Sequence, residues 1–220
     1  MNKQRQLKEQ LYALFAQVAN AMANPHRLEL LDLLVQGPRS VEELANEAHM
    51  TLANTSQHLQ RLKQARLVRD TREGLYVRYS LSDPAIARLW LQLRAIAQTQ
   101  NAEVERTLDA YRSHRHQFET ISAKELRARM QRNEVVLLDV RPHLEYQAAH
   151  LPRAVSMPLD ELDRRLSELP RRKTIVAYCR GPYCVFADKA LEQLSARGWK
   201  VARLEEGVAE WQMAGMPLEA

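Results

Sequence analysis

The chain contains little cysteine and little glycine, and it has no long apolar run. Only two of its 220 residues are cysteine and six are glycine. Two cysteines are too few for a disulfide scaffold, so we expect both to be thiols at rest in a reducing compartment. No apolar run approaches the roughly 18 residues of a membrane span, and the amino terminus has no apolar block followed by a small-residue cleavage site. We therefore expect a cytoplasmic protein with no membrane partner.

Acidic charge is scarcer in the first half of the chain than in the second. The whole chain carries a net charge of +5, and residues 1–118 account for +4 of it. Within this half, 61–78 holds six basic and two acidic residues. The excess indicates either a polyanionic partner or an ordinary solvated basic face.

The first half has the pattern of four helices, a hairpin and a further long helix. Apolar residues recur at helical spacing from Leu7 to Met22. The start signals of three more helices are Asn24 with Pro25, Ser40 with Glu43, and Thr51. In 67–81, β-branched and aromatic residues around a polar turn predict a β-hairpin, which completes a winged helix-turn-helix. The apolar helix that starts at Pro84 and reaches toward Tyr111 predicts a second copy of the chain as its partner.

A winged helix binds DNA by placing its second helix in the major groove and its hairpin beside the backbone. With Leu52, Leu59 and Leu62 expected to face the core, the opposite face of that helix is polar. The residues that we expect to contact DNA are Asn54, Ser56, Gln57, Gln60, Arg61, Arg69, Arg72 and Arg78. Asn and Gln pair with adenine and Arg with guanine or phosphate, and the hairpin arginines fit phosphate contacts. The alternative is a small helical domain that makes protein contacts.

The segments "ANPHRLELLDLLVQGPRSVEELA", "NTSQHLQRLKQARLV" and "GLYVRYSL" resemble the ArsR (arsenic-repressor-like) family of dimeric bacterial winged-helix repressors, over roughly residues 8–95. The resemblance implies a homodimer on a double-stranded, palindromic DNA operator, released when an inducer binds. Metal-sensing members place cysteines in the third helix, or Asp and His along the terminal one. Here the third helix has no thiol, and His114 and His116 do not share a helical face. We expect no metal site, and Arg66 stands where the family usually has glycine.

From Glu119 onward, short apolar strands alternate with helices. The strand candidates are 135–140, 154–157, 174–178 and 201–204, and the helix candidates are 122–132, 159–168 and 185–197. This alternation predicts an α/β domain with a mostly parallel sheet. We therefore expect a multidomain protein: a mainly-α winged-helix domain at 1–112, a linker at 113–118 and an α/β domain at 119–220.

Both cysteines lie in one segment, "VAYCRGPYCVF", between a predicted buried strand and a helix. Such a loop aims backbone N–H groups and a helix amino terminus at its centre, and so favours an anion. A cysteine at the start of this cradle, Cys179, should have a lowered pKa and react as a thiolate. Gly181 allows close backbone approach, and Arg180 adds positive potential. These residues indicate that Cys179 is a nucleophile.

The two cysteines have three other possible roles. A structural metal site needs about four ligands, and no second Cys or His pair at ligand spacing accompanies this one. A cysteine-based phosphatase loop requires arginine six positions after the cysteine, where Val185 stands. Inert buried cysteines are the third interpretation.

The segments "VVLLDVRPHLEYQAAHLPRAVSMPLDEL", "VAYCRGPYC" and "LEEGVAEWQMAGMPLE" resemble the single-domain rhodaneses, the sulfurtransferase fold, over about residues 119–219. The resemblance implies that Cys179 accepts a sulfane sulfur and holds it as a persulfide ringed by the N–H groups of the loop. A structural signature is also implied, and its members are Asp139, Arg141, Glu145 and His150. No cofactor is implied.

Rhodaneses often carry a basic residue near the end of the loop to bind thiosulfate, but Cys184 occupies that place here. A second thiol is placed to attack the Cys179 persulfide, release sulfide and close a disulfide; the alternative is a small filler residue. We therefore expect a transcriptional repressor whose rhodanese-like domain senses reactive sulfur at Cys179 and Cys184, from a small sulfur donor or an oxyanion. The alternatives are a sulfurtransferase that the winged helix localises or dimerises, and a rhodanese fold that acts only as a scaffold.

Overall fold

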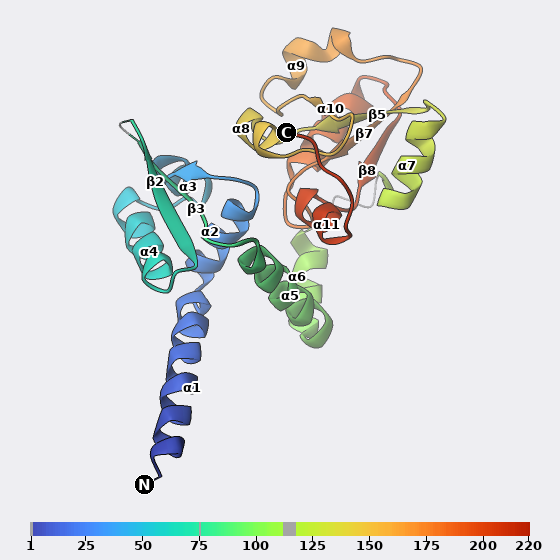
Figure 1. The fold of residues 1–220 in the computed structure, drawn as a ribbon. Helices are drawn as coiled ribbons and strands as arrows, with labels where there is room; N and C mark the ends of the chain where they lie inside the picture. Colours follow the sequence, from blue (N-terminus) through green and yellow to red (C-terminus); the bar gives the residue numbers. More distant parts are fainter. Residues whose placement is uncertain (1, 75, 112–117) are drawn as a thin grey trace. The chain divides into compact units, whose positions relative to one another are not determined.

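A computed structural model describes residues 2–74, 76–111 and 118–220, and these form two compact units (Figure 1). The units are Met1–Ala95 and Ile96–Ala220. The boundary between the units falls inside the helix Pro84–Gln100. Residues 96–111, predicted to belong to the first domain, therefore lie in the second unit. Of the predicted linker, 113–118, only Phe118 lies within the described residues.

The first unit is a winged helix-turn-helix, as the sequence predicts. Its elements are α1 (Lys3–Met22), α2 (Pro25–Val35), β1 (Arg39–Ser40), α3 (Val41–Glu47), α4 (Leu52–Gln64), β2 (Val68–Glu73), β3 (Tyr76–Leu81) and α5 (Pro84–Gln100), which runs on into the second unit. The predicted start signals are used: Asn24 accepts a hydrogen bond from the N–H of Arg27 at 3.2 Å, and the Ser40–Glu43 capping box is complete. Thr51 likewise accepts the N–H of Asn54, which starts α4.

A three-stranded antiparallel sheet in the order β1-β3-β2 accompanies these helices. The fully buried leucines of the core are Leu30, Leu31, Leu44, Leu59 and Leu62. The expectation that Leu52 faces this core was wrong, since 53% of it is exposed. Leu52 is the first residue of α4, and Thr55 takes the buried place in that turn, with its hydroxyl donating to the Thr51 carbonyl at 3.0 Å.

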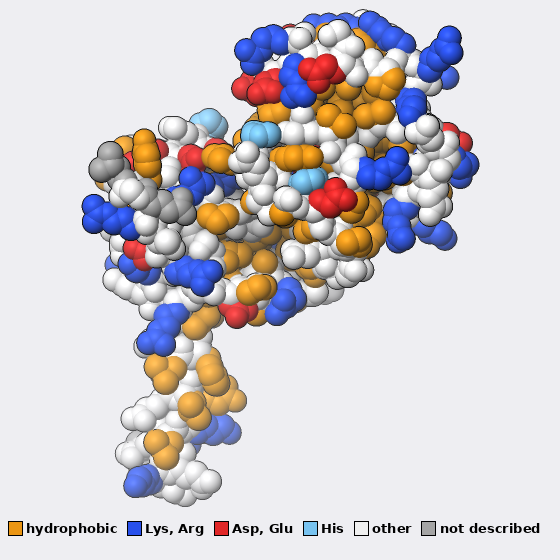
Figure 2. All heavy atoms as spheres, turned by 45° about the horizontal axis from the view of Figure 1, so that its top comes forward, with side chains coloured by type: hydrophobic (Ala, Val, Ile, Leu, Met, Phe, Trp, Pro, Cys, Tyr) orange, Lys and Arg blue, Asp and Glu red, His pale blue; other side chains and the backbone are white. Residues whose placement is uncertain are grey.

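The helix α1 carries an apolar face that no described residue covers. Leu7, Leu11, Leu14 and Phe15 are each more than half exposed, and Figure 2 shows orange side chains along this helix. On α5, Leu89, Leu93 and Ile96 are also exposed. Exposed apolar faces of this extent mark interaction surfaces.

The second unit is an α/β domain around a five-stranded parallel sheet, as predicted. Its helices are α6 (Ala102–Tyr111), α7 (Ala123–Gln131), α8 (His143–Ala148), α9 (Leu162–Arg165) with a 3-10 turn at Leu166–Glu168, α10 (Phe186–Ala196) and α11 (Val208–Met213). Its strands are β4 (Glu119–Ile121), β5 (Val135–Asp139), β6 (Val155–Ser156), β7 (Thr174–Tyr178) and β8 (Val201–Leu204). The strand order is β4-β8-β7-β5-β6, and every neighbouring pair is parallel. The central strand β7 therefore delivers its carboxyl end, and the residues that follow, to the middle of one edge of the sheet.

Helices cover both faces of this sheet. On one face, α7 and α11 pack Leu126 and Trp211 against the strands. On the other face, α9 and α10 contribute Leu162 and Leu191 to a cluster that also holds Cys179. Because helices cover the sheet on both sides, strands such as β5 and β7 are buried on both faces and consist of continuous apolar runs.

Several short elements were not predicted from the sequence. They are β1, β4, α8 and α11, which are too short to show a full repeat of either apolar period. The predicted long helix is interrupted at Asn101, whose side chain accepts the N–H of Glu103 at 3.0 Å and so begins α6. None of the described helices is both long and apolar enough to cross a membrane.

Candidate functional site

The two cysteines lie in the loop that joins β7 to α10. Cys179 is buried, Cys184 is half-buried, and both are free thiols. The Cys179 thiol donates to the backbone carbonyl of Cys184, with Sγ and O 3.4 Å apart, and the Cys184 N–H donates to the Gly181 carbonyl at 3.2 Å. The loop therefore curls around Cys179 and brings Cys184 against it.

Cys179 is the thiol of this pair that ionises first. Burial raises the pKa of Cys179, but a hydrogen bond from Cys184, the charge of Arg203 and the N–H groups of Ala187 and Gly181 outweigh burial and bring the pKa down to about 7. The hydrogen bond to Cys179, together with burial and the Cys179 charge, raises the pKa of Cys184. Near neutral pH a large fraction of Cys179 is thus thiolate, while Cys184 keeps its proton.

Two glycines let this loop lie close to its support. Gly181 has a φ of +120°, and a Cβ there would lie 2.9 Å from Oε2 of Glu210. A Cβ on Gly207, in the turn before α11, would lie 2.6 Å from the carbonyl carbon of Arg180. Glu210 also accepts the Gly207 N–H at 3.0 Å. The loop therefore rests on the turn before α11, and a side chain at either glycine would push it away.

A buried ion pair lies beside the loop, and sequence reasoning missed it. Nε of Arg203, in β8, is 2.9 Å from Oδ1 of Asp188, in the first turn of α10, and both side chains are almost fully buried. Arg203 pairs in register with Ala177 of β7. Cys179 comes two residues after Ala177, so it points to the same face of the sheet as Arg203. An arginine inside the apolar strand "VARL" is the signal that could have found it, because a buried charge needs a partner.

Arg180, predicted to add positive potential to the loop, is held in an ion pair with the buried Glu145. Its Nε lies 2.9 Å from Oε1 of Glu145, and its Nη2 contacts the same oxygen. The Arg180 guanidinium also lies over the ring of Phe186, 5.3 Å from the ring centre. A carboxylate therefore compensates the charge of Arg180.

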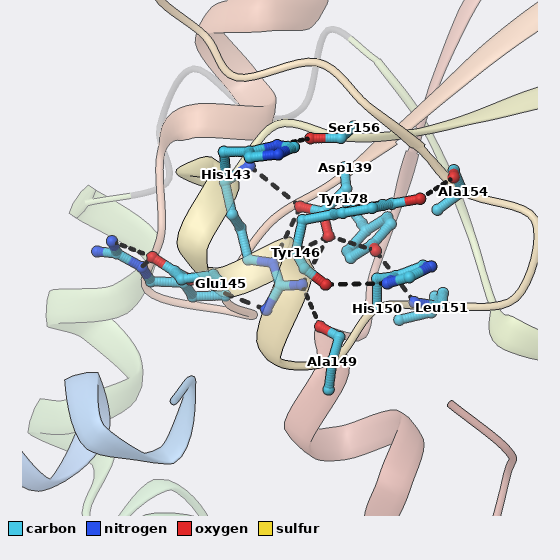
Figure 3. Close-up of polar contacts among 12 residues, drawn as sticks. Asp139, His143, Glu145, Tyr146, Ala149, His150, Leu151, Ala154, Ser156 and Tyr178 are labelled. Atoms are coloured by element: carbon cyan, nitrogen blue, oxygen red, sulfur yellow. Dashed lines mark hydrogen bonds and ion pairs between the residues drawn. The ribbon is translucent and has the colours of Figure 1, made fainter. Parts of the chain in front are cut away.

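The predicted signature residues form a buried network behind the loop (Figure 3). Arg141 donates from Nε to Asp139 Oδ1 at 2.9 Å and from Nη2 to the Ala149 carbonyl at 2.8 Å. The Tyr178 hydroxyl donates to Asp139 Oδ2 at 2.5 Å and accepts the Leu151 N–H at 3.1 Å. Since Tyr178 immediately precedes Cys179, this network holds the base of the loop.

His150 lies in the same region but takes part in packing. Its ring stacks on Tyr146 with the ring centres 3.7 Å apart, and its Nδ1 lies 2.9 Å from the Tyr146 carbonyl (Figure 3). The backbone of His150 exchanges hydrogen bonds with Glu219, at 2.8 and 2.9 Å. His150 therefore fastens the carboxyl-terminal segment to the domain.

A contact outside the predicted site joins the loop to α6. The hydroxyl of Tyr111, the last residue of α6, donates to the backbone carbonyl of Tyr183 at 3.0 Å. Tyr183 lies between the two cysteines. The loop thus carries a hydrogen bond to the helix that follows α5 in the chain.

The polar face of α4 carries the predicted DNA-reading residues, and they are not equally available. Gln57 and Arg61 are exposed, whereas Asn54 and Ser56 are half-buried. The side-chain amide of Gln60 donates to the Tyr79 hydroxyl at 3.1 Å. Gln57 and Arg61 are the best placed of the five to meet a partner.

The wing arginines divide in the same way. Arg69 and Arg72 are exposed on β2. Arg78 is half-buried, donates to the Pro38 carbonyl at 3.0 Å and lies 3.7 Å from Glu43. Arg78 therefore ties the wing to the start of α3, and Arg69 and Arg72 are the more accessible cations.

Within residues 2–74, 76–111 and 118–220, no three His, Cys, Asp or Glu side chains are grouped to hold a metal ion. His114 and His116 lie outside the described residues.

A winged helix-turn-helix followed by an α/β domain with a cysteine loop defines a class of two-domain regulators. Residues 24–70 match the bacterial regulatory proteins of the arsR family, and residues 122–214 match the rhodanese-like domain. The HTH-type transcriptional regulator Rv0324 of Mycobacterium tuberculosis is 42% identical over 205 residues, which cover 93% of this chain and 89% of that protein. The chain belongs to the ArsR family of HTH-type transcriptional regulators and carries a carboxyl-terminal rhodanese-like domain.

Other relatives match one half of the chain. A sulfurtransferase of Allochromatium vinosum is 30% identical over 88 residues, which cover 40% of this chain and 80% of that protein. Among solved structures, the homodimeric winged helix-turn-helix DNA-binding domain of Mb0332 from Mycobacterium bovis is 40% identical, with a TM-score of 0.40, and the match covers 41% of this chain and 84% of that one. The thiosulfate sulfurtransferase of Pseudomonas aeruginosa is 30% identical, with a TM-score of 0.45, and the match covers 51% of this chain and 22% of that one.

Proposed function

We propose that this protein is a homodimeric repressor whose affinity for its DNA operator depends on the sulfur state of Cys179 and Cys184. Family membership supports DNA binding through α4 and the wing. The exposed apolar faces of α1 and α5 support a second copy as partner, because burying apolar surface is favourable by about 25 cal/mol per Å². The thiolate loop supports sulfur chemistry at Cys179.

The observation that carries the link between the two activities is the hydrogen bond from Tyr111 to the Tyr183 carbonyl. Only Asn101 separates α6 from α5 in the chain, and α5 bears part of the exposed apolar face. A loop that changes shape when its cysteines react changes its bond to α6. If this bond is stronger in one of the two states of the dimer, DNA-binding or non-binding, its change shifts the equilibrium between them. Couplings of this kind are typically about 1–3 kcal/mol.

The first chemical step is sulfur transfer to Cys179. The thiolate attacks the outer sulfur of a donor R–S–SH, a bond forms between that sulfur and Cys179 Sγ, and the S–S bond of the donor breaks. The electron pair leaves with the R–S sulfur, which takes up a proton. The N–H groups of Gly181 and Ala187, which already face the thiolate, fit the negative charge of the resulting persulfide.

The second step resolves the persulfide through Cys184. After losing its proton, Cys184 attacks Cys179 Sγ, forms the disulfide and expels hydrosulfide. The sulfane sulfur is reduced to sulfide while the two cysteine sulfurs are oxidised, so no further oxidant is needed. The Cys179 charge is one cause of the raised pKa of Cys184, and sulfur transfer moves that charge outward, which eases the deprotonation of Cys184.

The test is fluorescence anisotropy with DNA from upstream of the gene for this protein, comparing reduced protein with protein treated with inorganic polysulfide. Each sample is checked by intact mass. We expect the operator affinity to change at least tenfold, or about 1.4 kcal/mol, and the change to vanish in Cys179→Ser. Tight binding that is unaffected by a confirmed persulfide would reject the proposal, and sulfurtransferase turnover in the same samples would favour an enzyme instead.

Cys184→Ser separates transfer from resolution in the same samples. We expect a long-lived persulfide on Cys179 in this variant and a transient one in the parent. An equally short-lived persulfide in both would reject the resolving role of Cys184.

A further inference from the structure

An open cavity lies beside the cysteine loop, at the carboxyl ends of β5 and β6. Its volume is about 520 Å³, within the range of small-molecule sites. Its lining residues are Val140, Pro142, His143, Pro158, Leu159, Asp160, Glu161 and Phe186. Five of these eight side chains are apolar, so the cavity suits a carbon skeleton better than a small inorganic ion.

Three residues of the cavity wall also pack in the cluster around the two thiols. Val140, in its wall, belongs to the same buried cluster as Cys179, and Leu159, Phe186 and Cys184 pack against that cluster. Phe186 begins α10 directly after the loop. A molecule in this cavity therefore lies beside the end of the cysteine loop, against residues that also pack around the thiols.

The charges around the loop do not favour a dianion such as thiosulfate. Arg180 is paired with Glu145, and Arg203 is paired with Asp188. Asp160 and Glu161 bring carboxylates to the cavity, and of these Glu161 pairs with Arg165 at 3.0 Å. The loop N–H groups serve the single negative charge on the reacting sulfur, and the compensated guanidinium groups offer little for a second one.

We propose that this cavity holds the organic group of the sulfur donor, so that the donor class is an organic persulfide whose carbon skeleton is apolar and carries no net negative charge. This inference rests on the proposed sulfur chemistry at Cys179 and names its substrate. Transfer follows the balance given above: Cys179 gains the outer sulfur, and the donor leaves as the thiol R–SH from the cavity.

The experiment measures the rate of persulfide formation on Cys179 by intact mass and peptide mapping in the full chain. The probes are benzyl persulfide, inorganic polysulfide and thiosulfate. For the parent protein we expect benzyl persulfide to react at least about tenfold faster than thiosulfate, the discrimination that a few apolar groups provide in a pocket.

Leu159→Trp fills part of the cavity, and neither cysteine is among the residues that line it. It should slow the reaction with benzyl persulfide about tenfold more than it slows the reaction with polysulfide, and the remaining polysulfide reaction reports that the loop is intact. Asp160→Lys should raise the thiosulfate rate, whereas Asp109→Lys, the same charge change on an exposed residue of α6, should not.

Equal slowing of both donors by Leu159→Trp, or a parent protein that prefers thiosulfate, would overturn the inference. These outcomes are distinct from failure of the proposed function. Operator binding that responds to polysulfide while Leu159→Trp shows no donor preference rejects the cavity alone. Cavity-dependent persulfide formation without any change in operator binding rejects the regulatory function alone.

Discussion

Opposite charges at Arg203 and Asp188 act on the same thiolate. Arg203 lowers the pKa of Cys179, and Asp188 compensates Arg203 at 2.9 Å. Cys184, Tyr183, Arg180 and Glu210 are further charged or titratable groups at the loop, and Arg180 is paired with Glu145. After the hydrogen bond from Cys184, the charge of Arg203 is the next cause that lowers the pKa of Cys179, and its strength depends on the balance within the Arg203–Asp188 pair.

Substitution of either member of this pair should shift the pKa of Cys179 in opposite directions. Asp188→Asn leaves the arginine charge uncompensated and should lower the pKa, whereas Arg203→Met should raise it, each by about one pH unit. The thiolate fraction rises as pH passes through the pKa, so the pH dependence of Cys179 alkylation by iodoacetamide, followed by peptide mass, measures both shifts.

Both substitutions break the same ion pair, and this makes them controls for each other. Loosening of the fold would move the two alkylation profiles in the same direction. Arg203→Lys keeps the positive charge, so its alkylation profile should stay close to that of the parent protein. If Arg203→Met unfolds, the profiles of Arg203→Lys and Asp188→Asn are compared instead.

At the scale of one element, α4 ends in a strained residue. Arg66 has a φ of +58°, and its N–H donates to the Lys63 carbonyl at 2.9 Å while the Leu67 N–H donates to the Leu62 carbonyl at 3.0 Å. This is the left-handed helix end that glycine normally occupies, so the glycine expected from the family and the geometry observed agree. Arg66 adopts this left-handed conformation at a cost in folding free energy, because its Cβ is crowded there and glycine has none.

Arg66→Gly should raise the free energy of unfolding of the first unit by about 1 kcal/mol, because arginine pays for the left-handed conformation and glycine does not. Hydrogen exchange of α4 peptides in urea measures this in the full chain. Asn133, with a φ of +57° in the second unit, is the matched control. Asn133→Gly should leave α4 unchanged, and a loss of α4 protection in Arg66→Gly would contradict the explanation.

At the scale of the whole molecule, the rhodanese-like domain with its cysteine loop and the helix-turn-helix of the arsR family belong to different units of one chain. The described contact that joins the cysteine loop to a helix continuing from the first unit's α5 is that of Tyr111 with the Tyr183 carbonyl. If this hydrogen bond transmits the state of the cysteines to the DNA-binding unit, removing the Tyr111 hydroxyl should reduce the DNA response without affecting sulfur transfer.

Tyr111→Phe should leave the rate of persulfide formation on Cys179 unchanged. It should reduce the sulfur-dependent change in operator affinity about two- to twelvefold, which is what a hydrogen bond of about 0.5–1.5 kcal/mol can contribute. Anisotropy and intact mass on the same samples measure both. Tyr183→Phe keeps the accepting carbonyl and serves as the control; an undiminished DNA response in Tyr111→Phe would exclude this route.

The helix-turn-helix and the cysteine loop were predictable because their signals are local. Caps at Asn24, Ser40 and Thr51 start helices in the predicted places, and the loop at Cys179 follows a strand whose apolar run is visible. Roles that depend on long-range contacts were not predictable. Gln60 bonds to Tyr79 and the half-buried Arg78 to Pro38, and these partners of residues expected to contact DNA lie 19 and 40 positions away in the chain.

The sequence by itself determined the two-domain class, the order of the elements and the position of both thiols, since these depend on apolar periods, caps and spacing within short segments. Only the tertiary structure decided which groups lower the pKa of Cys179, which arginine is compensated and what lies beside the loop. These properties arise where β7, β8, α10 and the turn before α11 meet, and residues far apart in the chain set the local field and shape there.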